Sequence, residues 1–135
     1  MMNTQSDDLA EFMAENLMPF KPFAYFDKHM DCIRVLIQDV SITEKRLSKY
    51  FTVATPNHGA FSGRNVGFTI KGVAHLFNEV GLPLSGVQML VNILNEIVKA
   101  MPHSAVQTVV EEFSEAISEN ELTVSFEEPE FAMAA

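Results

Sequence analysis

The sequence predicts an α+β fold, in which an antiparallel β-meander of about four strands packs against C-terminal helices and a short helix precedes it. Apolar and polar residues alternate in several stretches between positions 31 and 70, and apolar residues recur every three or four positions from residue 73 onward. The connections between the predicted strands are too short for parallel crossovers. The chain has 135 residues, of which 47% are hydrophobic, which is enough for one core. We predict a single domain over residues 1–135, made of an N-terminal helix (1–20), the meander (21–71), a helical part with a possible last strand (72–126) and a tail (127–135).

The first predicted element is a helix from Ser6 to Leu17. Ser6 is a typical N-terminal cap, and Asp7 and Asp8 favour the positive end of the helix dipole. Pro19 ends the helix. Its apolar stripe consists of Leu9, Phe12, Met13 and Leu17.

The meander follows an aromatic segment, Phe20 to Phe26, to which we assign no strand and in which we expect Tyr25 to be buried. Alternating apolar residues, β-branched residues and turn residues predict four strands. The run from Ile42 to Leu47 is the most polar of them, and its charges are typical of a sheet edge that avoids pairing with other chains. The predicted strands are Asp31–Gln38, Ile42–Leu47, Tyr50–Thr55 and Val66–Ile70.

Helices dominate the rest of the chain. A short helix from Val73 ends at Gly81, which is well suited to a left-handed C-terminal cap. A longer helix is predicted from Ser85 to Met101 and another from Ser104, because each serine is followed three residues later by glutamine, as in a capping box. Residues 122–126 form a possible last strand.

Charge is unevenly distributed along the chain. The net charge of −9 disfavours a general nucleic-acid or anionic-membrane binder, because such binding depends on Lys and Arg. Residues 21–75 nevertheless hold eight of the nine basic residues and only four acidic ones, whereas residues 1–20 hold four acidic residues and no basic one. Either this region binds an anionic ligand or an acidic partner segment, or it pairs with the acidic helices of the same chain or of a second copy. The candidate binding residues are Arg34, Arg46, Arg64 and Lys71.

Two further groups of residues suggest chemistry. In an extended chain Asp27, His29 and Asp31 would project to one side, and His29 and Asp31 with a distant histidine would supply the ligands of a two-histidine, one-carboxylate iron site. The alternative is a solvated polar turn. Cys32, the single cysteine, lies in a predicted strand, where we expect a buried, inert thiol. We predict no catalytic residue and no cofactor.

One stretch resembles a known group of proteins. The segment Tyr25-Phe26-Asp27-Lys28-His29-Met30-Asp31-Cys32-Ile33-Arg34-Val35, with Val66-Gly67-Phe68-Thr69-Ile70 downstream, resembles a family of small uncharacterised bacterial β-rich domains. That family shows an Asp-x-x-x-Asp spacing before a strand and a later Val-Gly-x-x-Ile strand. The resemblance covers residues 25–71 and implies a meander, but it implies no activity.

These features together predict a non-enzymatic, dimeric binding or interaction module. The homodimer is expected because the helix Ser85–Met101 is apolar over more than half its circumference, which is more than a small sheet covers. The alternative is a binding protein or enzyme for a small anionic ligand, with a pocket between sheet and helices. We expect a cytoplasmic protein without a membrane span, since the single cysteine fits a reducing compartment and polar residues interrupt the most apolar window.

Overall fold

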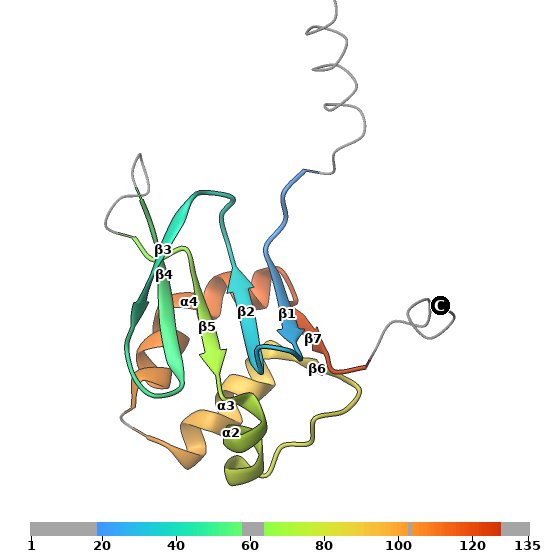
Figure 1. Ribbon diagram of the computed structural model, residues 1–135. Helices are drawn as coiled ribbons and strands as arrows, with labels where there is room; N and C mark the ends of the chain where they lie inside the picture. Colours follow the sequence, from blue (N-terminus) through green and yellow to red (C-terminus); the bar gives the residue numbers. More distant parts are fainter. Residues whose placement is uncertain (1–18, 58–63, 103, 128–135) are drawn as a thin grey trace, which may run out of the picture.

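A computed structural model describes residues 19–57, 64–102 and 104–127, and within them a five-stranded antiparallel sheet is the central element. The strands lie in the order β1-β2-β5-β4-β3, as Figure 1 shows. The predicted α+β class is confirmed, whereas the predicted N-terminal helix and the last eight residues of the tail lie outside the described residues. The strands are β1 (Phe23–Asp27), β2 (Cys32–Leu36), β3 (Ile42–Arg46), β4 (Phe51–Pro56) and β5 (Gly67–Lys71).

Three helices and a small second sheet follow the large sheet. The helices are α2 (Val73–Val80), α3 (Leu90–Ala100) and α4 (Ala105–Glu119). The second sheet pairs β6 (Val87–Met89) with β7 (Thr123–Ser125). The helices lie on one side of the large sheet, with α2 directly below β5 in Figure 1. No helix in the described ranges is long and apolar enough to cross a membrane.

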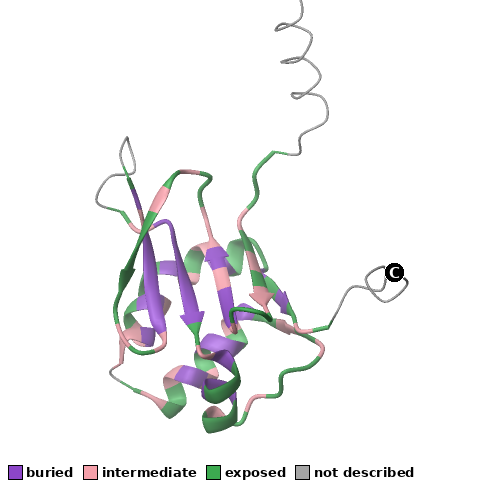
Figure 2. Cartoon of the chain, viewed as in Figure 1, coloured by how far each residue is buried: buried purple, intermediate pink, exposed green. Residues whose placement is uncertain are grey.

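The core lies between the sheet and the helices. Alternate residues of the central strands, such as Ile33 and Phe68, are at most 1% exposed and face helix residues such as Ile97 and Phe113. The rings of Phe68 and Phe113 are 5.1 Å apart, which joins β5 to α4. Each such side chain contributes about 1.5–3 kcal/mol through the removal of apolar surface from water. Figure 2 shows this burial concentrated in β2, β5 and β4, while β3 is almost wholly exposed.

The simple meander is wrong, because β5 lies between β2 and β4. The first four residues of β5 are all buried, so this strand requires a neighbouring strand on each side. The charged strand β3 is mostly exposed and is suited to the edge of the sheet. A fifth strand, β1, was also missed. It pairs with β2 through a tight turn, and its outward side chains Phe23 and Tyr25 are exposed, so the expected burial of Tyr25 is wrong.

The helix predicted from Ser85 begins instead at Leu90. Gln88 lies in β6, and its side-chain amide donates hydrogen bonds to the carbonyl oxygens of Pro83 (2.7 Å) and Ser85 (3.2 Å). Ser104 does precede α4, but its hydroxyl donates to the carbonyl of Met101 (2.7 Å) instead of capping α4. Both predicted capping boxes are therefore wrong, because the polar side chains find acceptors in the preceding loops. The predicted cap at Gly81 is confirmed, since its φ is 90° and its N–H donates to Phe77.

Candidate binding face of the sheet

One face of the large sheet carries no described helix. We call it the open face, and its side chains come from the strand positions that alternate with the core positions. Cross-strand pairing arranges most of them in three rows, beyond which the pair Ile42 and Pro56 also lies on this face. The first row is Tyr25, Arg34, Thr69, Thr52 and Arg46; the second is Phe23, Leu36, Gly67, Ala54 and Glu44; the third is Asp27, Cys32 and Lys71.

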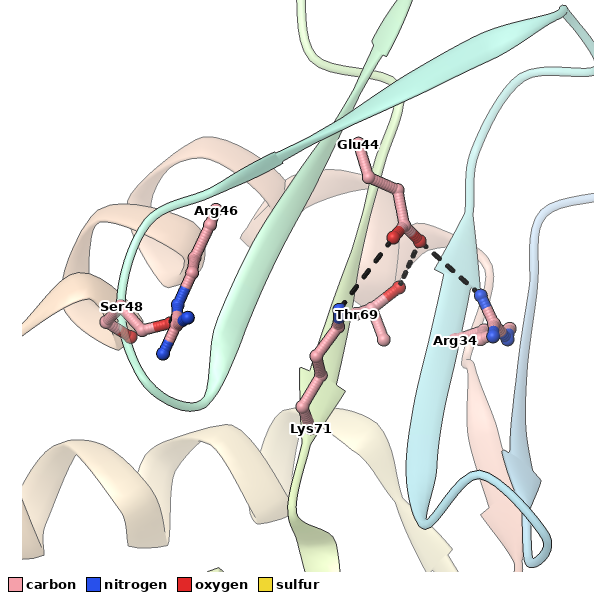
Figure 3. A network of polar contacts seen from close by, with 6 residues as sticks. All are labelled: Arg34, Glu44, Arg46, Ser48, Thr69 and Lys71. Carbon is pink, nitrogen blue, oxygen red and sulfur yellow. Dashed lines mark hydrogen bonds and ion pairs between the residues drawn. The ribbon is translucent and has the colours of Figure 1, made fainter.

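A carboxylate on edge strand β3 joins two basic residues of the open face. An oxygen of Glu44 lies 3.4 Å from Nη1 of Arg34, and its other oxygen lies 4.0 Å from Nζ of Lys71. The hydroxyl of Thr69 donates to the same carboxylate at 3.4 Å. Figure 3 shows Arg34 and Lys71 approaching Glu44 from two sides. All three charged side chains are more than a third exposed, so each ion pair contributes only about 0–1 kcal/mol.

Arg46 stands apart from this network. Its Nε donates to the carbonyl oxygen of Ser48 at 3.1 Å, and within the described part of the chain it forms no ion pair. Figure 3 shows its side chain directed toward Ser48 and away from Glu44. Three basic side chains therefore share the open face with Glu44 and, in the third row, with Asp27, whose carboxylate accepts a hydrogen bond from the N–H of Met30.

A hollow of about 110 Å³ lies beside this network. Ala54, a small residue of the second row, lines the hollow, and Gly67 is its neighbour on β5. A Cβ at Gly67 would lie 2.3 Å from the carbonyl oxygen of Val35, so glycine is required by the close approach of β2. The side chains that line the hollow include Phe23, Tyr25, Leu36, Ile42, Arg34 and Glu44.

Exposed aromatic rings border the hollow on the β1 side. Phe23 is 38% exposed and Tyr25 is 44% exposed. Their ring centroids are 5.8 Å apart, and the ring of Phe20 lies 6.0 Å from that of Phe23. Large apolar rings with open surface, beside arginine, are typical of protein interfaces.

The centre of the first row contains a polar atom without a partner. Thr52 is buried, and its hydroxyl makes no hydrogen bond with any residue that the structure describes. A buried hydroxyl without a partner costs about 1–3 kcal/mol. The open face therefore contains one buried hydroxyl whose hydrogen-bonding requirement the described residues do not satisfy.

The acidic helix α4 does not cover this face. Its carboxylates are exposed on the helical side of the molecule, and Glu112 accepts a hydrogen bond from the side chain of Asn65 at 2.9 Å. In the ranges that the structure describes, no α4 carboxylate forms an ion pair with a basic residue of the sheet. The ion pairs of Arg34 and Lys71 are made instead with Glu44, a residue of the sheet itself.

The four basic residues chosen from sequence are thus only partly brought together. Arg34, Arg46 and Lys71 share the open face, whereas Arg64 lies exposed in the loop before β5, outside the strand rows. Sequence reasoning missed the aromatic and hydroxyl residues of this face. The signal for Phe23 and Tyr25 was their two-residue spacing, which is the period of a strand.

His29 and Asp31 lie in the turn between β1 and β2, which agrees with the alternative of a polar turn before a strand and not with an extended chain. Asp31 has a φ of 51°, and its carboxylate accepts the N–H of Ala74 at 2.9 Å, which stabilises the first turn of α2. His29 is exposed. Among the described residues there is no group of three or more His, Cys, Asp and Glu side chains suited to a metal ion.

Cys32 is buried at the start of β2, as predicted. Burial raises the pKa of its thiol, an effect that the nearby Arg34 guanidinium partly opposes. A raised pKa disfavours the reactive thiolate. This agrees with the predicted inert thiol.

A second hollow, of about 440 Å³, lies where the end of β1 meets α2 and the chain before β6. It is lined by Phe26, Lys28, Asp31, Ala74, Leu84 and Phe126. This hollow is the described counterpart of the predicted pocket between sheet and helices, but none of the four basic residues chosen from sequence lines it.

Comparisons with protein-family models, with curated proteins and with solved structures found no match. The resemblance of residues 25–71 to small bacterial β-rich domains therefore stays a prediction.

Proposed function

We propose that this protein is a non-enzymatic binding module whose open face binds an acidic segment of a partner polypeptide. One observation carries the proposal: Arg34, Arg46 and Lys71 share the face of the sheet that the acidic helix α4 leaves uncovered. A partner carboxylate could replace Glu44 between Arg34 and Lys71, or pair with Arg46.

The apolar part of the face supports a polypeptide partner over a free inorganic anion. Phe23 and Tyr25 border a hollow whose apolar wall includes Leu36 and Ile42. Aromatic and apolar contacts supply binding free energy, while charge complementarity increases the association rate and specificity. We therefore expect a partner segment in which glutamate or aspartate alternates with leucine or phenylalanine.

The test is fluorescence anisotropy of a labelled 12-residue peptide composed of Glu, Leu and Phe. We expect binding by the full chain that weakens with salt and is reduced several-fold by Arg34→Gln. The matched control is Lys99→Gln, which changes charge equally on α3, where Lys99 pairs with Glu96. Equal affinity for both variants, or for a peptide with Gln in place of Glu, would contradict the proposal. Tighter binding of an oligouridine than of the acidic peptide would point to nucleic acid instead.

The predicted homodimer stays part of the proposal, with its interface in the segment that was predicted as the helix Ser85–Met101. Ile93 of this segment is fully buried within one chain. Val87 and Met89 of β6 are 63% and 45% exposed and are the side chains of this stretch available to a second copy. Sedimentation equilibrium of the wild type and of Val87→Ser/Met89→Ser tests this, and an unchanged mass would contradict an interface at β6.

The second candidate function is the binding of a small anionic ligand in the larger hollow. Its volume falls within the range of ligand sites, and its lining includes Phe26 and Phe126, whose ring centroids are 5.0 Å apart. Thermal-shift measurements with aromatic carboxylates test it. Ligands that stabilise Arg34→Gln as much as the wild type, but not Lys28→Gln, would favour this site over the open face.

A further inference from the structure

We propose that the partner carboxylate received by the open face is the C-terminus of a polypeptide, and that its last side chain, an aliphatic one, fills the smaller hollow. This inference rests on the proposed function, because it concerns the same face and names the part of the partner that binds there. Three features of the described residues support it: a pair of adjacent donors, a loosely held carboxylate beside them, and a hollow the size of one side chain.

The donors are the side chains of Arg34 on β2 and Thr69 on β5. The two residues are direct cross-strand partners, so their Cβ atoms stand about 4.5–5.5 Å apart. Nη1 of Arg34 and the hydroxyl of Thr69 donate to the same oxygen of Glu44, each at 3.4 Å. Both residues also line the smaller hollow. A carboxylate at the rim of this hollow is therefore within reach of both donors.

Glu44 holds the place of this carboxylate through long contacts. A charge-assisted hydrogen bond to a carboxylate is typically about 2.7–2.9 Å long, whereas Glu44 lies 3.4 Å from Arg34 and 4.0 Å from Lys71. Figure 3 shows Glu44 extending from β3 toward Thr69 and Arg34. Its side chain is 37% exposed and comes from an edge strand, so it has room to turn into solvent. An incoming carboxylate therefore replaces long contacts with closer ones.

The hollow has the size and the lining for one aliphatic side chain. Its volume is about 110 Å³, and residues from all five strands line it, so the open face is concave at this point. An engineered apolar cavity of about 150 Å³ holds benzene, so the smaller hollow holds a side chain such as that of leucine or valine. Its apolar wall is formed by Phe23, Leu36, Ile42 and Ala54.

The shared lining favours a chain end over an internal acidic residue. Because Arg34 and Thr69 themselves line the hollow, the bound carboxylate and the bound apolar group lie next to each other. In an extended peptide, neighbouring side chains point to opposite faces, and those that share a face are about 6.6–6.8 Å apart. In a C-terminal residue, the carboxylate and the side chain branch from the same Cα. Capture of a C-terminal carboxylate is also a recurring mode of peptide recognition.

The first experiment compares two labelled peptides on the full chain by fluorescence anisotropy. One is a 12-residue peptide of Glu, Leu and Phe that ends in leucine with a free carboxylate. The other has a C-terminal amide and one additional Glu at its N-terminal end, so that the total charge is equal. We expect the free-carboxylate peptide to bind at least about ten-fold more tightly, because the amide loses the charge-assisted hydrogen bonds. Replacement of the last leucine by alanine should weaken binding about ten-fold, because less apolar surface is buried.

The second experiment fills the hollow with a side chain of the protein. Ala54→Leu adds an aliphatic group to the wall without a change of charge. In this variant the preference for a last leucine over a last alanine should fall from about ten-fold to less than about two-fold. The ratio of two affinities measured on one protein does not depend on the folded fraction, so a destabilised variant still answers the question. Ala100→Leu, at the exposed end of α3, is the matched control and should keep the ten-fold preference. An unchanged preference in Ala54→Leu would overturn the assignment of the hollow.

The two proposals fail in different ways. If the amidated peptide binds as tightly as the free-carboxylate peptide, the C-terminal inference is overturned while the proposed function stands. If neither peptide binds, the proposed function fails and the C-terminal inference fails with it. If N-acetyl-leucine alone binds as tightly as the 12-residue peptide, the face takes a small carboxylate, and a polypeptide partner is contradicted.

Discussion

Replacement of Gly67 by alanine tests the close approach of β2 and β5, the two strands that carry Arg34 and Lys71 of the open face. The new Cβ would lie 2.3 Å from the carbonyl oxygen of Val35 and 3.2 Å from Cα of Leu36. Both atoms belong to the backbone, so no side-chain rotation relieves the contact. The two central strands must therefore separate by about 1 Å to restore an ordinary distance of about 3.3–3.6 Å.

The expected loss of stability follows from this displacement. Overpacking in a well-packed region costs about 1–3 kcal/mol, and weakening a neighbouring ladder hydrogen bond adds about 0.5–1.5 kcal/mol. We expect Gly67→Ala to lower the free energy of unfolding by about 2–4 kcal/mol. At a typical urea dependence of about 1–3 kcal/mol per molar, the urea midpoint falls by about 0.7–4 M.

Urea denaturation followed by circular dichroism measures this change. Gly81→Ala is the control, because no atom lies within 4 Å of its Cβ and only the strain of its φ of 90° remains. That strain costs about 1–2 kcal/mol. A loss for Gly67→Ala below about 0.5 kcal/mol, or smaller than that for Gly81→Ala, would refute the reasoning.

Three other predictions concern polar groups. Glu44→Gln removes the negative charge between Arg34 and Lys71. A unit charge about 5 Å from a bound carboxylate in water repels it by about 0.8 kcal/mol, so the acidic peptide should bind this variant about four-fold more tightly in the anisotropy measurement. Weaker binding would contradict this prediction. Asp31→Ala should lower the free energy of unfolding in urea by about 0.5–2 kcal/mol, because the hydrogen bond from the N–H of Ala74 is lost. Asp31→Asn keeps an acceptor and tolerates positive φ, so it should lose less. Equal losses would argue against a stabilising role for this hydrogen bond. Burial raises the pKa of the Cys32 thiol, so the folded state holds the thiol proton more tightly than the unfolded state; this stabilisation is complete below the unfolded pKa of about 8.5 and is lost as the pH rises through the folded pKa. The free energy of unfolding should therefore fall more steeply above about pH 8 in the wild type than in Cys32→Ala. Parallel slopes would contradict the raised pKa.

Much of the fold was predictable because it depends on local pattern. The strands around Ile33 and Phe68 were recognised from alternation, and α2 ended at Gly81 because glycine adopts positive φ without strain. The errors arose where a nonlocal contact competes with a local signal. Gln88 is the glutamine of a Ser-x-x-Gln sequence that is typical of a capping box. It lies instead in β6, which pairs with a strand more than thirty residues away in the sequence.

The site was predictable in part for the same reason. Basic residues could be counted in the sequence, but their grouping depends on strand order. Arg34 of β2 and Glu44 of β3 meet on the open face although β5 and β4 lie between their strands. A meander would instead have made β2 and β3 direct neighbours, and β5 with Thr69 would have lain elsewhere.

The sequence by itself determined the α+β class, most element positions, the buried thiol at Cys32 and the concentration of basic residues between acidic flanks, because periodicity and composition are local properties. Only the tertiary structure decided which side of the sheet those basic residues occupy, and that the acidic helix α4 lies on the other side. The physical reason is that the helices bury the apolar face of the sheet, and the alternation of strand side chains then leaves Arg34, Arg46 and Lys71 on the opposite face.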